Sequence, residues 1–177
     1  MEFMFNNATA FNQDLNAWNV SNVTYMSYMF MEANSFNENI SKWDVSSVTN
    51  MSQMFNNATN FNGDISAWDV SSVTGITSMF QFATNFNQDI STWNVSNVTD
   101  INGMLSMFSY ATNFNQDIST KEVTKNGVTY TAWDVSSVVK MNSMFVGATN
   151  FNQDLSSWDV SSVTNMSQMF RDATNFN

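Results

Sequence analysis

Carboxylates recur along this 177-residue chain at one place in a repeated pattern. The file contains Asp14, Asp64, Asp89, Asp117 and Asp154, with Asn39 once in the same place. Stacked at the spacing of neighbouring strands, about 5 Å, such carboxylates could hold calcium between them. They could instead cap turn amides, which the amide at Asn39 favours. No calcium loop of known spacing is present, so we expect no cofactor and keep calcium as the open alternative.

A second file of acidic and amide side chains is the best candidate for a partner-binding surface. It contains Asn19, Asp44, Asp69, Asn94, Asp134 and Asp159. Each member lies between a Trp and a Val that are two residues apart, so we expect the file to face outward from a short strand. This face could bind a partner, or it could be a solvated face that prevents aggregation. A recurring Thr column adds a remote alternative, in which a flat repetitive face binds a polysaccharide or ice lattice.

A third file consists only of asparagines. Its members are Asn12, Asn37, Asn62, Asn87, Asn115, Asn152 and Asn177. A side-chain amide stacked on its own copy can satisfy backbone groups in a loop that has no ladder of its own. We therefore predict a structural asparagine ladder in the return loop of each unit.

The sequence lacks the residues that most catalytic and metal sites need. The chain has no His and no Cys, so the commonest general base and the commonest soft metal ligands are missing. A hydrolase built on two carboxylates would need a pair that interrupts the repeat, and none does. A net charge of −10 opposes binding to nucleic acid. No apolar run reaches the roughly 18 residues of a membrane span, so we expect no insertion into a membrane. From the lack of catalytic groups we predict a protein that is not an enzyme.

These side chains belong to a repeat whose period is usually 25 residues, with one step of 28 and one of 37. Each unit is marked by a Met-Phe pair, and the units start at Met4, Met29, Met54, Met79, Met107 and Met144, with a partial unit at Met169. A fixed period of this length is typical of stacked arrays, in which invariant apolar columns form the core. We therefore predict one array over residues 1–177.

Two periodicities alternate within a unit. Trp68 and Val70 are spaced as in a strand, whereas the positions from Val73 through Met79 to Ala83 are spaced as in a helix. Thr residues stand where helix N-caps would lie, at Thr49, Thr74, Thr99 and Thr164. The pattern predicts an α/β repeat solenoid with short parallel strands on one face and short helices on the other.

The long step contains an insertion at residues 120–131 that reads as a hairpin with Asn126-Gly127 at its tip. Insertions in repeat proteins often carry the binding function, so Lys121, Lys125 and Tyr130 are candidate partner-binding residues. The alternative is a tolerated decoration without function. A shorter insertion at residues 102–105 is expected to reshape the start of one helix.

The motif Trp-Asp-Val-Ser-Ser-Val-Thr-Asn-Met-Ser-Gln-Met-Phe, at residues 43–55 and 158–170, resembles a known family. It is similar to the 25/26-residue repeat of bacterial surface proteins of the Listeria and mycoplasma lipoprotein type. That repeat resembles the BspA-like branch of leucine-rich repeats, and the spacing from Ile65 through Trp68 and Val70 to Val73 echoes a leucine-rich-repeat strand. The resemblance implies a solenoid at the cell surface or outside the cell that serves in adhesion or protein binding. It brings no catalytic residues.

We therefore expect a non-enzymatic module whose partner is a protein or a cell-surface ligand. The alternative is a structural spacer or stalk, which calcium could stiffen. Neither end shows a polar capping module, so we expect a segment of a longer protein. Open ends of this kind could stack head to tail, which predicts end-to-end self-association.

Overall fold

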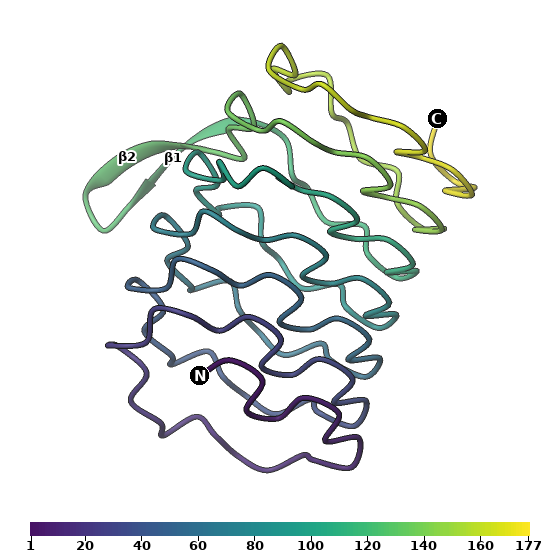
Figure 1. Cartoon of the computed structure of the whole chain (residues 1–177). Coiled ribbons are helices and arrows are strands. Elements are labelled where there is room, and N and C mark those ends of the chain that lie inside the picture. Colours follow the sequence, from purple (N-terminus) through teal and green to yellow (C-terminus); the bar gives the residue numbers. More distant parts are fainter.

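The computed structural model, which describes all 177 residues, shows irregular coils stacked along one axis, from the N-terminal coil at one end to the C-terminal coil at the other (Figure 1). Its only regular elements are two strands, β1 (Lys121–Lys125) and β2 (Val128–Ala132), which form one antiparallel hairpin. The coils themselves consist of turns joined by short extended segments.

Turn and inter-coil hydrogen bonds hold the backbone together. Of 80 backbone–backbone hydrogen bonds, 74 lie outside the two strands. Some close turns within a coil, as where the Ala58 amide donates to the Phe55 carbonyl at 3.1 Å. Other backbone amides donate to a carbonyl of the next coil, as Phe55 does to the Met79 carbonyl at 2.9 Å. Backbone groups are thus satisfied without a helix or a continuous sheet.

The predicted helices are absent because each unit contains two residues with left-handed backbone. In one unit these are Gln53 (φ 58°) and Asn57 (φ 57°), and the same places are left-handed in the other units. A residue with positive φ at the third place of a turn ends that turn, so α-helix cannot continue through it. Consecutive turns repeat every four residues and bring Met54 and Ala58 to the same inner face. Helix-like spacing therefore arose from a series of turns.

The predicted N-caps have a different task. The Thr74 amide and hydroxyl both donate to the Thr49 carbonyl of the preceding coil, at 2.8 and 3.2 Å. Thr49 bonds in the same way to the Thr24 carbonyl, again at 2.8 and 3.2 Å. Thr49, Thr74 and Thr164 thus join one coil to the next, whereas Thr99 makes no such bond, and none of the four caps a helix.

The predicted parallel strands are also wrong. The segment from Trp68 to Val70 lies between two turns, closed by the bonds from the Trp68 amide to the Ile65 carbonyl and from the Val73 amide to the Val70 carbonyl. Parallel pairing is limited to isolated bridges, such as Asn50 with Gly75. The leucine-rich-repeat-like α/β solenoid, and with it the BspA-like assignment, is therefore corrected to a stack of turn-built coils.

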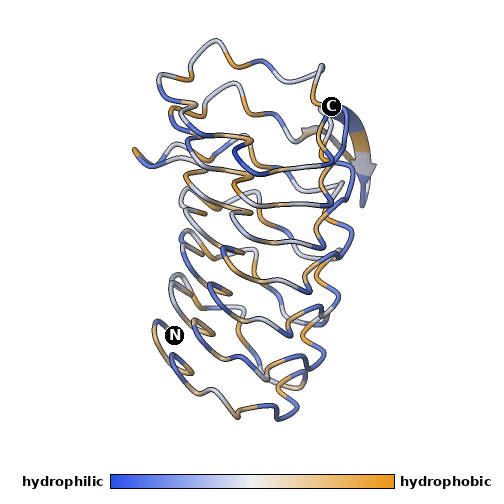
Figure 2. Cartoon of the chain, turned by 90° about the vertical axis from the view of Figure 1, so that its right-hand side faces the viewer, coloured by the Kyte–Doolittle hydropathy of each residue, from blue (hydrophilic) through white to orange (hydrophobic).

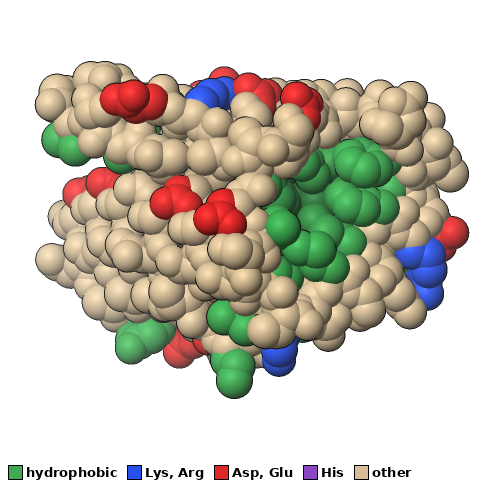
Figure 3. Space-filling view, turned by 90° about the horizontal axis from the view of Figure 1, so that it is seen from above, with side chains coloured by type: hydrophobic (Ala, Val, Ile, Leu, Met, Phe, Trp, Pro, Cys, Tyr) green, Lys and Arg blue, Asp and Glu red, His purple; other side chains and the backbone are tan.

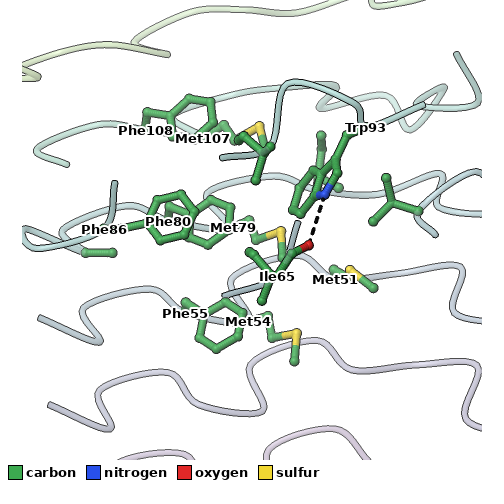
Figure 4. Packing of buried hydrophobic residues seen from close by; sticks show 14 of the residues in the cluster. Met51, Met54, Phe55, Ile65, Met79, Phe80, Phe86, Trp93, Met107 and Phe108 are labelled. Atoms are coloured by element: carbon green, nitrogen blue, oxygen red, sulfur yellow. Dashed lines mark hydrogen bonds between the residues drawn. The ribbon is translucent and has the colours of Figure 1, made fainter. Parts of the chain in front are cut away.

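A single apolar core runs through the stack. It contains 46 buried residues, and Figure 2 shows hydrophobic and hydrophilic stretches alternating along every coil. Phe55 stacks on Phe61 of its own coil at 3.9 Å and on Phe80 of the next coil at 5.7 Å between ring centroids. The Trp93 indole donates to the Ile65 carbonyl at 3.4 Å (Figure 4). Because these contacts recur from coil to coil between the two ends of the stack, the invariant apolar columns are the core, as predicted.

The three-residue insertion disturbs the stack locally. Gly103 has a φ of 53°, and a Cβ there would lie 2.7 Å from the Lys140 carbonyl oxygen. The series of bridges through Tyr25, Asn50 and Gly75 stops before this coil. No helix starts here, so the insertion makes a tight turn against the next coil and reshapes no helix.

Candidate functional site

The asparagine file forms the predicted ladder. The backbone N–H of Asn62 donates to the side-chain Oδ1 of Asn37 at 2.7 Å, and the backbone N–H of Asn87 donates to the Oδ1 of Asn62 at 2.9 Å. The series continues without a break from Asn12 to Asn177. The side chains thus replace a backbone ladder in a loop that has none, and the structural interpretation is confirmed.

The first carboxylate file caps turns. Asp64 accepts the Ser66 amide at 2.9 Å, and Asn39 accepts the Ser41 amide at the same distance. The other members do the same with the residue two places on. No group of three or more acidic side chains lies close enough together to hold a metal ion. The capping interpretation is therefore confirmed for every member.

The second file faces outward, although no strand carries it. Its members each accept the amide of a Ser two residues on, as Asp69 does from Ser71 at 3.0 Å. Asn94 and Asp134 are half-buried and the other members are exposed; the members are Asn19, Asp44, Asp69, Asn94, Asp134 and Asp159. The file therefore lies along one side of the stack, and we call it the acidic column.

The hairpin turns back over the stack instead of projecting freely from it. β1 and β2 pair from Lys121 with Ala132 to Lys125 with Val128, and Asn126 and Gly127 form the tip. The Tyr130 hydroxyl donates to the Thr92 carbonyl at 2.6 Å. Lys125 Nζ donates to the carbonyls of Ser66 and Ala67, at 3.4 and 3.2 Å. These bonds attach the hairpin to two coils that precede it in the chain.

The hairpin and the acidic column enclose a cleft of about 230 Å³. The column contributes Asp69 and Asn94, and the hairpin contributes Lys125 and Tyr130. Two separately predicted groups of residues therefore meet at one place. The remaining column members, Asn19, Asp44, Asp134 and Asp159, lie outside this cleft, as does Lys121. Lys121 instead forms an ion pair with Asp117 at 2.6 Å, at the base of the hairpin.

Two ionisable groups are affected by this arrangement. Burial and the nearby Asp69 carboxylate raise the pKa of Tyr130, partly offset by its hydrogen bond to Thr92. Burial alone would raise the pKa of Asp117, but hydrogen bonds from Lys121 and Ser119 lower it to about 2. The Tyr130 hydroxyl therefore stays protonated at neutral pH and keeps donating to the Thr92 carbonyl.

Some residues that line the cleft were not among the binding residues predicted from the sequence. They include Asn126 and Val128 of the hairpin, and Trp68 and Thr92 of the coils. Val128 is 63% exposed and lies two places from Tyr130, so strand alternation puts both on one face of β2. That alternation could have identified Val128. Nothing in the sequence tells which coil the hairpin covers, so Thr92 could not be found.

A family model described as "Mycoplasma protein of unknown function, DUF285" matches the chain over residues 1–58, 36–131 and 126–177. The chain belongs to this family. The match supports the repeat resemblance at the level of a repeat family, and it does not support leucine-rich repeats specifically. No curated protein and no solved structure matches the chain. No helix in the structure is long and apolar enough to cross a membrane.

Proposed function

We propose that this repeat domain is a non-enzymatic binding module that is displayed at the cell surface or outside the cell and recognises a protein or a cell-surface ligand. The observation that carries the proposal is the cleft between the hairpin and the acidic column. Its residues come from the one long insertion and from an otherwise uniform column, so it is a unique site on a repetitive surface. Unique sites on repetitive scaffolds are typical of binding surfaces.

The rest of the chemistry agrees with binding. The chain has no His and no Cys, and each carboxylate of the two files accepts a turn amide with one of its oxygens. The net charge of −10 repels a phosphate backbone, so the proposed partners do not include nucleic acid.

A structural spacer is the second candidate function. The continuous aromatic stack favours it, because the ring centroids of Phe residues in successive coils lie 5.3–6.1 Å apart from one end of the chain to the other. A stalk stiffened by calcium would unfold at a higher temperature when calcium is added after chelation. Lattice binding is weakened as a third option, because Thr84 and Thr112 already donate their hydroxyls to the preceding coil.

Removing the hairpin tests binding against the spacer role. Deleting residues 120–131 reduces the 37-residue step to 25 and joins Ile118-Ser119 to Ala132-Trp133, the sequence found at residues 65–68. The deletion should therefore preserve the stack, which thermal unfolding would check. Beads coated with the full chain should adhere to cultured epithelial cells, and beads coated with the deletion variant should adhere much less. No adherence with either chain would favour the spacer, and equal adherence would show that binding does not use the hairpin.

We also propose that the 177-residue chain associates end to end. Viewed from the C-terminal end, a large hydrophobic patch is visible (Figure 3), and Val160 and Met166 of the last coils are each 38% exposed. At the opposite end Trp18 is 40% exposed. Each later Trp indole bonds to a carbonyl one coil back, as Trp43 does to Leu15, so Trp18 of a second copy would face the Leu155 carbonyl. Sedimentation at several concentrations should show oligomers, and only monomer would exclude the idea.

A further inference from the structure

We propose that the cleft between the hairpin and the acidic column binds a neutral sugar ring. The inference rests on the proposed binding function and gives that function a ligand class. It starts from the hydrogen-bonding groups that the cleft residues leave unused.

Asp69 and Asn94 each keep one polar atom free. The Asp69 Oδ1 accepts the Ser71 amide at 3.0 Å, and its Oδ2 has no partner within the protein. The Asn94 Oδ1 accepts the Ser96 amide and hydroxyl at 3.2 and 2.7 Å, so its Nδ2 group remains free to donate. The cleft wall therefore offers a charged acceptor and a neutral donor whose positions are fixed by turn hydrogen bonds.

The hairpin side adds a cationic donor. Lys125 Nζ uses two hydrogen bonds on the carbonyls of Ser66 and Ala67, and an ammonium group has three donors. One N–H is left for a ligand. Its charge offsets that of Asp69, so this cleft is close to neutral although the chain carries a net charge of −10.

A hydroxyl group suits this set of partners. A single hydroxyl oxygen can donate to the Asp69 carboxylate while it accepts from Lys125 or Asn94. Neighbouring hydroxyls on one ring could use all three partners at once. The Tyr130 ring and the exposed Val128 side chain supply apolar surface for the C–H face of the ring.

The size of the cleft limits the ligand. Pockets for drug-sized molecules usually hold about 300–1,000 Å³. This cleft, at about 230 Å³, is smaller and suits a single ring. A terminal sugar on a glycan chain would fit this description, because the rest of the chain would extend into solvent.

The test uses the full 177-residue chain and a panel of neutral methyl glycosides of glucose, galactose, mannose and N-acetylglucosamine. In two-dimensional NMR spectra, at least one glycoside should shift the amide signals of Asp69, Asn94, Asn126 and Tyr130. Replacing Asp69 by Ala should weaken that binding about tenfold, because a hydrogen bond to a charged group is lost. Asp44→Ala is the matched control, since Asp44 caps the same turn one coil earlier and lies outside the cleft. It should leave binding unchanged.

The outcomes separate this inference from the proposed function. If the beads adhere through the hairpin but no glycoside shifts the cleft signals, the sugar is excluded and protein binding stands. If a peptide shifts these signals and the glycosides do not, the ligand class is also wrong. Equal losses in Asp69→Ala and Asp44→Ala would show that the effect comes from the turn cap, which would likewise overturn the inference.

Discussion

Single side chains join one coil of this protein to the next. In the return loop the bond is made by an asparagine, whose Oδ1 accepts the backbone amide of the same residue one unit later. The Trp side chains and the Thr hydroxyls make similar bonds to carbonyls of the preceding coil. The Asn, Trp and Thr columns thus recur because most of their members make the same hydrogen bond to the neighbouring coil.

The asparagine ladder predicts the cost of removing one member. Asn62→Ala leaves the half-buried Asn87 amide without its acceptor and should lower the free energy of unfolding by about 1–2 kcal/mol. Asn60→Ala is the control, because the exposed Asn60 side chain only accepts a long hydrogen bond of 3.4 Å from Asn85. Urea unfolding of both variants measures the difference. Equal losses would mean that the ladder does not stabilise the stack.

At this scale the sequence was a good guide. The ladder and the turn caps at Asp64 and Asn39 could be predicted because each depends only on a residue and its copy or its near neighbour. The same locality identified the apolar columns as core.

The elements were predicted less well. Turns with a left-handed residue at every fourth place give the same apolar spacing as a helix, so Met54, Phe55 and Ala58 could not distinguish the two. The decisive residues, such as Gln53 and Asn57, vary between units, and only one of them, Gly147, is a glycine, the residue that usually reveals positive φ. The hairpin had a clear local signal in Asn126-Gly127. Its contacts with Ser66 and Thr92 are far away in sequence and had none.

Two glycines with positive φ give a prediction for the short insertion. A Cβ at Gly103 would lie 2.7 Å from a carbonyl oxygen of the next coil, whereas a Cβ at Gly127, at the hairpin tip, would meet nothing within 4 Å. Both Ala variants share the left-handed strain, about 1–2 kcal/mol. Gly103→Ala should therefore lose distinctly more stability in thermal unfolding than Gly127→Ala. Similar losses would show that the insertion is not packed as described.

The whole molecule should respond to acid through its turn caps. Hydrogen bonds from Ser amides and hydroxyls lower the pKa of four Asp carboxyls below 3.8, and Asp117 is lowered further by Lys121; the five are Asp44, Asp64, Asp117, Asp154 and Asp159. The unfolded chain therefore takes up protons at a higher pH than the folded chain. Stability should be complete above about pH 4 and should fall as the pH approaches 2.

Urea midpoints measured between about pH 6 and pH 2 test this expectation. They should be nearly constant down to about pH 4, because the chain has no His, and then decline. A midpoint that rises below pH 4 would mean that repulsion within the carboxylate files outweighs the caps.

At the same scale, the cleft exists only if the hairpin is held against the stack. Measuring backbone amide order parameters by NMR over residues 121–132, together with contacts between the Tyr130 ring and Thr92, tests this most directly. The bonds to Thr92, Ser66 and Ala67 predict clear Tyr130–Thr92 contacts and order parameters near 0.85, as in rigid backbone. Values below about 0.6 without those contacts would mean a free hairpin and no preformed cleft, which would contradict the account.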